Sequence, residues 1–425
     1  MKSKTQQSQI PITKPNPQWA KLPLFNRKNW SRVRFDNVVE NLNETCDPAE
    51  AGLERVIAME HLEPGSLHIR AWGNVADGTT FTRRCRPGQV LFGKRRAYQR
   101  KVAVAEFDAV VSGDIYVLAP KGDRLLPELL PFLCLSERFF QHAVGTSAGS
   151  LSPRTNWSSL ASFEFDLPPI DQQRRIAEIL WAVDEVGENA VASFNNAEGL
   201  RVAKLCELYR NGLQTGQTVA TPLGARPKHW DVSPLGKHYQ VQLGKMMSPK
   251  AVKGSSQRPY LRNANVQWNR LDLTQVETMS FNEREAQKFE LRVGDILACE
   301  GRHVGKSAMW RNEIPGACYQ KALHRIRALN GEQIPEFLLY QMEYQSLSGV
   351  FADQTGETTI PHLPAERLRA IHFVFPPKQE QLAIVAEIET ILKCKTTLEG
   401  HVEASRRLLT TFVEGVVCGQ SLEEL

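Results

Sequence analysis

The chain has 425 residues, a formal net charge of +5 and 42% hydrophobic residues, which fits two to four folded domains and is weak evidence for nucleic-acid binding by itself. No run approaches the roughly 18 apolar residues that a membrane helix needs. The eight cysteines form no CxxC pair, and the polar N-terminus has no apolar core of a signal peptide. We therefore expect a cytoplasmic protein with free thiols and without a zinc or redox motif.

The sequence of the first 169 residues predicts an N-terminal arm followed by an α/β domain. Residues 1–28 are rich in Lys, Gln and Pro and predict a flexible arm, whose lysines either approach a phosphate backbone or stay solvated. Residues 29–169 mix short apolar strands with turns and predict a first domain. Its expected elements are strands at 38–39, 56–57, 89–92, 102–104, 115–118 and 158–167, and a helix over 128–142.

Residues 170–213 predict one long helix. Apolar and small residues recur at alternating spacings of four and three, as in a heptad seam; they are Ile176, Leu180, Val183, Gly187, Ala190, Phe194 and Ala197. Asp171 suits the first turn, and Gly212 suits the C-terminal cap. At about 1.5 Å per residue, such a helix is roughly 60 Å long.

The second half repeats this order. Residues 214–228 predict a linker, 229–377 a second mixed α/β domain, 378–417 a second long helix and 418–425 a tail. Inside the second domain we expect strands at 295–299 and 321–328 and a helix over 335–346. The second long helix keeps the seam through Ile384, Ile388, Ile391, Lys395, Leu398, Val402, Ser405, Leu409 and Phe412. The two helices predict an antiparallel coiled coil, although one long helix packed on a globular domain is an alternative.

The two halves also match residue by residue. Pro168-Pro169 followed by Gln173 returns as Pro376-Pro377 followed by Gln381, and positions 168 and 376 differ by 208. Further pairs are Glu128 with Glu336, Pro153 with Pro361, Leu160 with Leu368, Phe165 with Phe373 and, at other offsets, Gly88 with Gly294 and Trp30 with Trp230. The ends match best and the middles worst. We therefore expect a molecule with pseudo-twofold symmetry. The similar ends of the two repeats either bind a common partner or serve only as scaffold.

A basic run in the first domain is the main candidate for nucleic-acid contact. Residues 83–101 contain eight Lys or Arg and no acid, with a tyrosine among them. Clustered guanidinium groups bind phosphates and read guanine edges, whereas a solvated loop is the plainer explanation. The candidate contacts are Arg83, Arg84, Lys94, Arg95, Arg96, Tyr98, Arg100 and Lys101, and Arg86 completes the run.

The second domain offers a more mixed set. Its candidate DNA contacts are Lys245, Arg262, Asn263, Asn265, Arg302, His303 and Lys306. Asn263 and Asn265 could read adenine edges, but an asparagine in a turn is the commoner explanation.

Catalytic signatures are incomplete. Gly305-Lys306-Ser307 resembles the end of a phosphate loop, but Glu300 stands where the first glycine belongs. Asp295, Glu300 and Arg302 imitate a nuclease carboxylate set only loosely. Amino-methylation, Gly-x-Ser-x-Gly and His-Glu-x-x-His motifs are absent from the sequence, so it predicts a binder with no catalytic residues, no metal ligands and no cofactor of its own.

These features resemble the specificity subunit of Type I restriction-modification systems. Two globular units are each followed by a Pro-Pro-x-x-x-Gln helix, and residues 91–101 with 112–117 are similar to one class of target recognition domain. Residues 260–266, 294–297 and 319–325 are similar to another class. The resemblance covers about residues 30–420 and implies an α/β (α+β) fold with two recognition domains joined by an antiparallel coiled coil.

The resemblance also implies a function and partners. Each recognition domain would read one half of a bipartite, asymmetric target in double-stranded DNA, and the helices would set the gap. Two modification subunits, which use S-adenosylmethionine, would bind this chain, and restriction and translocase subunits would join them in phage defence. A non-catalytic coiled-coil adaptor and a divergent autonomous nuclease remain the alternatives.

Overall fold

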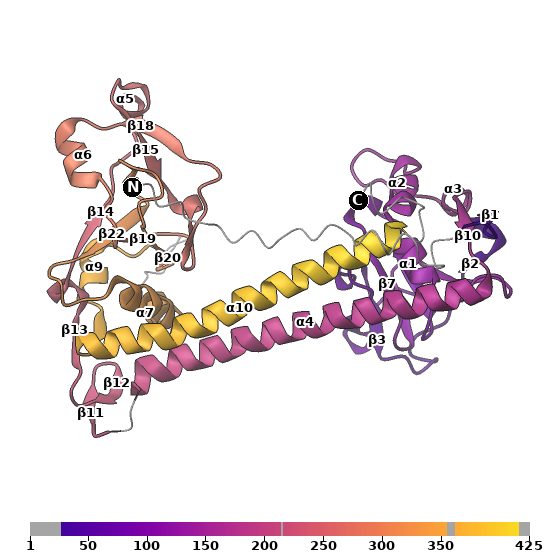
Figure 1. The fold of residues 1–425 in the computed structure, drawn as a ribbon, viewed down its shortest axis with the longest axis horizontal. Coiled ribbons are helices and arrows are strands. Elements are labelled where there is room, and N and C mark those ends of the chain that lie inside the picture. The colour runs from indigo at the N-terminus through magenta and orange to yellow at the C-terminus, as the bar shows by residue number, and fades with distance from the viewer. Residues whose placement is uncertain (1–26, 214–215, 355–361, 416–425) are drawn as a thin grey trace. The chain divides into compact units, whose positions relative to one another are not determined.

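The computed structural model describes residues 27–213, 216–354 and 362–415 (Figure 1). It divides into unit 1, Met1–Ser193 with Leu398–Leu425, and unit 2, Phe194–Thr397. Almost all of the predicted arm and all of the predicted tail lie outside the described residues. Within the described ranges, no helix has the length and apolar character needed to span a membrane.

Unit 1 is built on two four-stranded sheets. One has the order β2-β9-β6-β7 and the other β4-β3-β8-β5, and a short pair, β1 with β10, lies beside the start of the first long helix. The strands are β1 Ser31–Arg34, β2 Val39–Leu42, β3 Arg55–Ile57, β4 Gly73–Asn74, β5 Arg83–Cys85, β6 Val90–Gly93, β7 Val102–Val104, β8 Ala109–Val111, β9 Ile115–Pro120 and β10 Glu164–Leu167. Three helices, α1 Leu130–Leu135, α2 Glu137–Gly145 and α3 Trp157–Ala161, complete it.

Unit 2 repeats this arrangement. Its four-stranded sheet has the order β14-β22-β19-β20, its second sheet the order β18-β15-β21, and β13 pairs with β23. The strands are β11 Thr218–Thr221, β12 Gly224–Pro227, β13 Asp231–Pro234, β14 Tyr239–Leu243, β15 Gln257–Leu261, β16 Val266–Gln267, β17 Arg270–Leu271, β18 Glu277–Ser280, β19 Ile296–Cys299, β20 Ser307–Met309, β21 Cys318–Tyr319, β22 Leu323–Ala328 and β23 His372–Phe375. The helices are α5 Pro249–Lys253, α6 Glu283–Phe289, α7 Pro335–Leu347, α8 Val350–Gln354 and α9 Ala365–Ala370.

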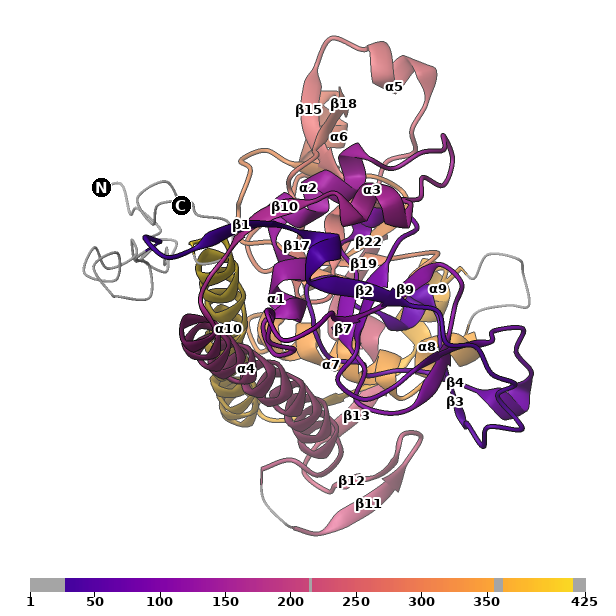
Figure 2. The ribbon, with the colours of Figure 1, turned by 90° about the vertical axis from the view of Figure 1, so that its right-hand side faces the viewer.

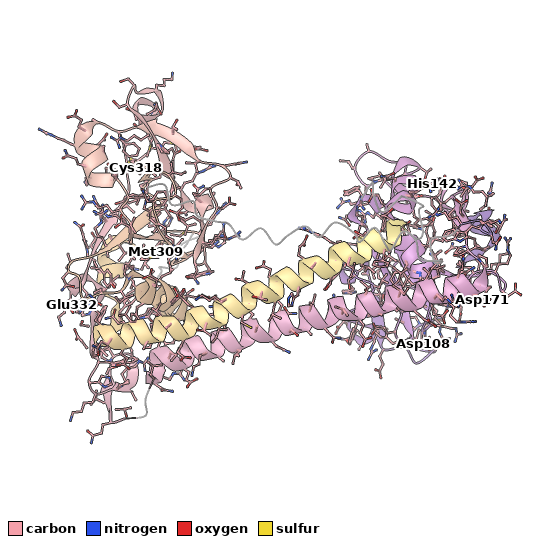
Figure 3. The ribbon with its side chains drawn as sticks, viewed as in Figure 1. Asp108, His142, Asp171, Met309, Cys318 and Glu332 are labelled. Carbon is pink, nitrogen blue, oxygen red and sulfur yellow. The ribbon has the colours of Figure 1, made fainter. Side chains whose placement is uncertain are left out.

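Two long helices, α4 Ile170–Asn211 and α10 Lys378–Val413, run side by side (Figures 1 and 2). Asp171 lies at the N-terminal end of α4 (Figure 3), and Gly212 follows the last turn with a φ of 73° while its N–H donates to the Leu208 carbonyl at 2.9 Å. The predicted end at residue 213 was therefore two residues late. The second helix, α10, extends to Val413 and continues through 414–415 as a π-helical turn, and the predicted positions 416 and 417 are not described.

The predicted seam is confirmed, because every seam residue of both helices is buried or half-buried. In unit 1, Ile176 and Leu180 of α4 share a core with Leu409 of α10. A Cβ placed on Gly187 would lie 3.6 Å from the Ser405 Cβ, so the missing side chain permits close approach there. In unit 2, the C-terminal half of α4 pairs with the N-terminal half of α10, which makes the pair antiparallel.

The Pro-Pro-x-x-x-Gln motif forms the same joint in both units. Gln173 is 1% exposed, and its Nε2 donates to the carbonyls of Arg124 and Pro168. Gln381 is also 1% exposed and donates to the Pro376 carbonyl. The tryptophan pair repeats as well, since Trp30 Nε1 donates to Gln172 and Trp230 Nε1 to Glu380. Each glutamine thus holds the start of its long helix against its own globular unit.

Three predicted elements differ from the structure. The helix expected over 128–142 is divided into α1 and α2, because Ser136 leaves the helix and its Oγ accepts the Phe139 N–H. Only the end of the strand expected over 158–167 is a strand, since α3 occupies its first residues. The expected linker contains the β11–β12 hairpin, which turns at residues 222–223, and Gly224 directly after the turn has a φ of 86°.

Candidate nucleic-acid interface

Most of the candidate residues lie on equivalent loops of the two sheets. Strands β6 and β7 in unit 1 correspond in sheet order to β19 and β20 in unit 2, and β7 and β20 are edge strands. We name residues 94–101 the first edge loop and residues 300–306 the second edge loop. The first holds Lys94, Arg95, Arg96, Tyr98, Arg100 and Lys101, and the second holds Arg302, His303 and Lys306.

The first edge loop is a tight turn that turns a tyrosine outward. Arg96 and Arg100 adopt left-handed backbone conformations, with φ of 52° and 55°, on either side of a short 3-10 helix, Ala97–Gln99. Non-glycine residues rarely adopt this conformation, so the loop must be held by its surroundings. The Arg96 N–H donates to the Pro153 carbonyl at 2.7 Å, and Ala97 is buried. Tyr98 between them is 54% exposed, so its ring can contact a ligand.

Beside this turn, two arginines share one carboxylate. Arg95 NH1 lies 3.3 Å from Asp114 Oδ2, and Arg154 Nε lies 3.0 Å from Asp114 Oδ1. Arg154 comes from a loop that pairs with Arg95 as an isolated bridge. The sequence reasoning missed Arg154, because it lies more than fifty residues beyond the basic run and carries no local signal.

Two further cations border this pair. The Lys94 ammonium lies 4.9 Å from the centroid of the Tyr116 ring, and its pKa is lowered by burial and then by the charge of Arg83. Arg83 NH1 donates to the Ile115 carbonyl at 2.8 Å. Across the described ranges, Asp114 is the only carboxylate that forms an ion pair with Arg83, Lys94, Arg95 or Arg154. We name these four and Asp114 the Asp114 cluster, whose surplus of positive charge suits a phosphate.

Four other cations of the basic run are paired, whereas the buried Nε of Arg96 has no hydrogen-bond partner among the described residues. The run is free of acids only in the sequence, because the fold brings carboxylates to it. Arg84 pairs with Asp108 at 3.3 Å, and Arg86 with Glu44 at 2.6 Å. Arg100 pairs with Glu137, and Lys101 Nζ donates to the Met59 carbonyl. The pKa of Glu137 is lowered by its hydrogen bond from Arg100. DNA contact by these residues stays a prediction, and their existing bonds favour a structural role.

The second edge loop leaves two candidates without partners. Arg302, with a φ of 66°, and His303 are exposed, and their side chains form no hydrogen bond or ion pair with the part of the chain that the structure describes. Gly305, with a φ of 79°, packs against Phe351 so closely that a Cβ there would lie 2.3 Å from the ring. Lys306 Nζ donates to Gln267 at 3.1 Å. The base of the loop is thus fixed while its tip stays open.

The four remaining candidates in unit 2 have internal partners. Lys245 Nζ lies 2.6 Å from both the Ser280 carbonyl and Glu285, and Arg262 pairs with Glu277 at 3.0 Å. Both side chains are therefore already paired with carboxylates of unit 2.

The two asparagines close turns. Asn265 is 3% exposed, accepts the Arg262 N–H and donates to the carbonyls of Asp272 and Gln275. Asn263 Nδ2 donates to the Gly301 carbonyl and so braces the second edge loop. For Asn265 the turn explanation fits every bond, and adenine contact by either asparagine stays a prediction.

No nuclease carboxylate set forms from Asp295, Glu300 and Arg302. Asp295 is 1% exposed, and both of its oxygens accept hydrogen bonds from Arg327 at 2.6 Å. Among the described residues, no group of three or more His, Cys, Asp or Glu is placed to hold a metal ion. The geometry therefore provides two braced, exposed loops and a cationic cluster.

Comparisons with known proteins agree with this arrangement. The family model described as Type I restriction modification DNA specificity domain matches residues 79–190 and 227–405. A segment of 192 residues is 28% identical to the Type I restriction enzyme EcoDI specificity subunit of Escherichia coli, and the match covers 41% of each chain.

Two solved structures share the fold. A chain from a structure describing complex assembly and conformational transition of the type I R-M system is similar over 91% of this chain and 97% of that one, with 19% identity and a TM-score of 0.60. The Type I restriction-modification S subunit from M. genitalium matches over 92% and 97%, with 12% identity and a TM-score of 0.52. Because the family model matches more than half of the residues, in two segments, the chain belongs to the Type I restriction-modification DNA specificity family.

Proposed function

We propose that this chain is the DNA-recognition subunit of a Type I restriction-modification complex and that each unit reads one half of a bipartite target. The observation that carries the proposal is the repetition of one sheet with two different edge loops. The first loop presents Tyr98 beside the Asp114 cluster, and the second presents Arg302 and His303. Since the side chains differ, the half-sites differ and the target is asymmetric.

Phosphate and base contacts have separate tasks in this proposal. The Asp114 cluster binds backbone phosphates and provides affinity that falls as salt rises. The exposed side chains of the edge loops contact base edges and provide sequence choice. The paired helices α4 and α10 set the gap between the half-sites.

The proposed complex supplies the chemistry through other subunits. Two modification subunits bind this chain and methylate adenines with S-adenosylmethionine, and restriction and translocase subunits join them. The chain itself contributes recognition and no catalytic residue or cofactor. This division agrees with the missing catalytic motifs in the sequence.

The proposal is tested by co-expressing the chain with its modification subunit and mapping methylated adenines across the host genome. We expect one gapped, asymmetric motif that disappears when this chain is omitted. Methylation that is indifferent to the chain, although the modification subunit is active, would favour the adaptor alternative. Metal-dependent cleavage by the purified chain alone would favour the nuclease.

A further inference from the structure

A buried ion pair joins α4 to α7 within unit 2. Arg201 NH1 lies 3.0 Å from Glu343 Oε2, and Arg201 NH2 lies 2.7 Å from Glu343 Oε1. The two side chains are only 6% and 9% exposed. Taking two charges out of water is costly, and apolar pairs of similar volume often serve stability equally well. Stability alone therefore does not account for this pair.

The equivalent positions of unit 1 carry no ion pair. At the offset of 208 that relates Glu128 to Glu336, the counterpart of Glu343 is Leu135, which packs against the core of unit 1. At the same offset, the counterpart of Arg201 is Leu409 of α10, which is buried in unit 1. Its neighbour along the seam, Ser405, is also uncharged. The ion pair is thus specific to unit 2, and its role is to be sought in what unit 2 does differently.

One side of the pair is tied to both long helices. Glu198, one turn earlier on α4, accepts hydrogen bonds from Arg201 Nε at 3.0 Å and from its NH2 at 2.8 Å. Lys395 of α10 lies 2.6 Å from Glu198. These cations lower the pKa of Glu198 to about 2, the hydrogen bond from Arg201 being the largest cause. Arg201 is therefore held in one orientation on the helix surface.

The other side of the pair reaches the second edge loop. Glu343 Oε2 accepts a hydrogen bond from Asn269 Nδ2 at 2.8 Å. Asn269 forms the turn between β16 and β17 with a φ of 57°, and its N–H donates to the Ser307 carbonyl at 2.9 Å. Ser307 begins β20 directly after the second edge loop, and Lys306 bonds the same hairpin through Gln267. A continuous series of contacts thus runs from the long helices to this loop.

We infer that Arg201, Glu343 and Asn269 are positioning residues that fix the second edge loop on the helical scaffold and so determine how strictly unit 2 reads its half-site. The inference rests on the proposed function. Hydrogen bonds between charged groups restrict the distance and orientation of their partners, whereas an apolar contact does not. A reading loop held this way keeps Arg302 and His303 at a defined position against the base edges.

The test uses the complete complex and variants that separate position from folding. N269G keeps the left-handed turn, because glycine accepts positive φ, but removes the bond to Glu343. The double variant R201M/E343L removes both charges together, so that neither is left buried alone. N312G is the matched control, because Asn312 is also left-handed, with a φ of 70°, is exposed and belongs to the same unit. E403L/R407M removes an exposed pair from α10 as a second control.

Methylated adenines are mapped for each complex, and a variant in Arg302 and His303 shows which half-site belongs to unit 2. We expect N269G and R201M/E343L to lose about tenfold or more of the discrimination at that half-site, with the other half-site, the gap and the melting temperature close to wild type. Both controls should retain the wild-type motif. An unchanged motif in both test variants, or equal loss at both half-sites, would overturn the inference while leaving the proposed function intact. A wild-type complex without a bipartite motif would instead refute the proposed function.

Discussion

The carboxamide of Gln173 accepts a hydrogen bond from the Leu126 N–H at 2.9 Å, and so joins the first turn of α4 to the segment before α1. Gln381 accepts the Ile334 N–H at 3.0 Å in the corresponding place before α7. Both side chains are buried, and both donate to the carbonyl of the first proline of their own motif. The repeated motif is thus a repeated joint between globular unit and helix.

Replacing either glutamine should loosen only its own unit. In Q173A the Leu126 N–H and two carbonyls lose their hydrogen-bond partner in a buried site. Each group left unsatisfied lowers the free energy of unfolding by no more than about 1–3 kcal/mol. We expect faster amide exchange around residues 124–135 in Q173A and around 331–347 in Q381A, measured by hydrogen exchange. Q141A, a change on the exposed face of α2, serves as control. Faster exchange in both units from one substitution would contradict the joint model.

A histidine clamp predicts pH dependence in unit 1. His68 Nε2 lies 2.8 Å from Asp184 on α4, and Nδ1 lies 3.0 Å from Glu106. The hydrogen bond to Asp184, with that to Glu106, raises the pKa of His68 to about 9. Since the folded pKa exceeds the unfolded value near 6.5, this stabilisation is fully present below pH 6.5 and is lost as pH rises through 9.

The contribution of His68 to stability is tested by measuring the melting temperature between pH 6 and pH 9.5. We expect the melting temperature of the wild type to fall by about 2–4 °C over this range relative to H68Q, the shift for a loss of about 1 kcal/mol in a unit of this size. Parallel pH profiles for the two proteins would show that His68 contributes no such linkage.

The Asp114 cluster predicts the salt dependence of DNA binding. Replacing Arg95 and Arg154 by alanine removes two cations, and each lost phosphate contact should reduce the slope of log affinity against log salt by about one. R86A is the control, because Arg86 is already paired with Glu44. Titrations of the assembled complex at several salt concentrations give both slopes. A slope as steep in the double variant as in the wild type would remove the cluster from the interface.

The helical seam predicts the gap in the target. Removing one heptad from each long helix, residues 187–193 and 399–405, keeps the two seams in register, because Gly187 lies opposite Ser405 in the antiparallel pair. The helices then shorten by about 10 Å, which corresponds to roughly three base pairs at 3.4 Å each. Methylation mapping should therefore show a shorter gap between unchanged half-sites. A gap of unaltered length would contradict the role of the helices as spacers.

The sequence predicted the features that depend on periodicity and repetition. The seam, the start of α4 at the motif of Gln173 and the helix now seen as α7 all follow from local spacing and apolar pattern. The break at Ser136 was missed, because the apolar face of residues 128–142 continues across it while a hydroxyl caps a new helix. Local pattern alone could not weigh that cap against the periodicity.

The candidate site was predictable only in part. The basic run marked the first edge loop, but the acids that pair with Arg84, Arg86 and Arg100 come from distant parts of the chain. Arg154 could not be predicted either, because it is distant in the sequence from the basic run that it joins. Likewise, the partner of Arg201 could not be inferred, since Glu343 lies 142 residues away and only the packing of α7 on α4 brings them together.

In the proposed complex, each unit reads one half of a single target. Methylated adenines should be mapped for two variants of the complete complex, R96A/Y98A in the first edge loop and R302A/H303A in the second. We predict that each variant relaxes a different half of one gapped motif and leaves the other half and the gap unchanged. If both variants relax the same half, or if neither changes the motif in complexes that still methylate DNA, recognition does not lie in these loops and the account is contradicted.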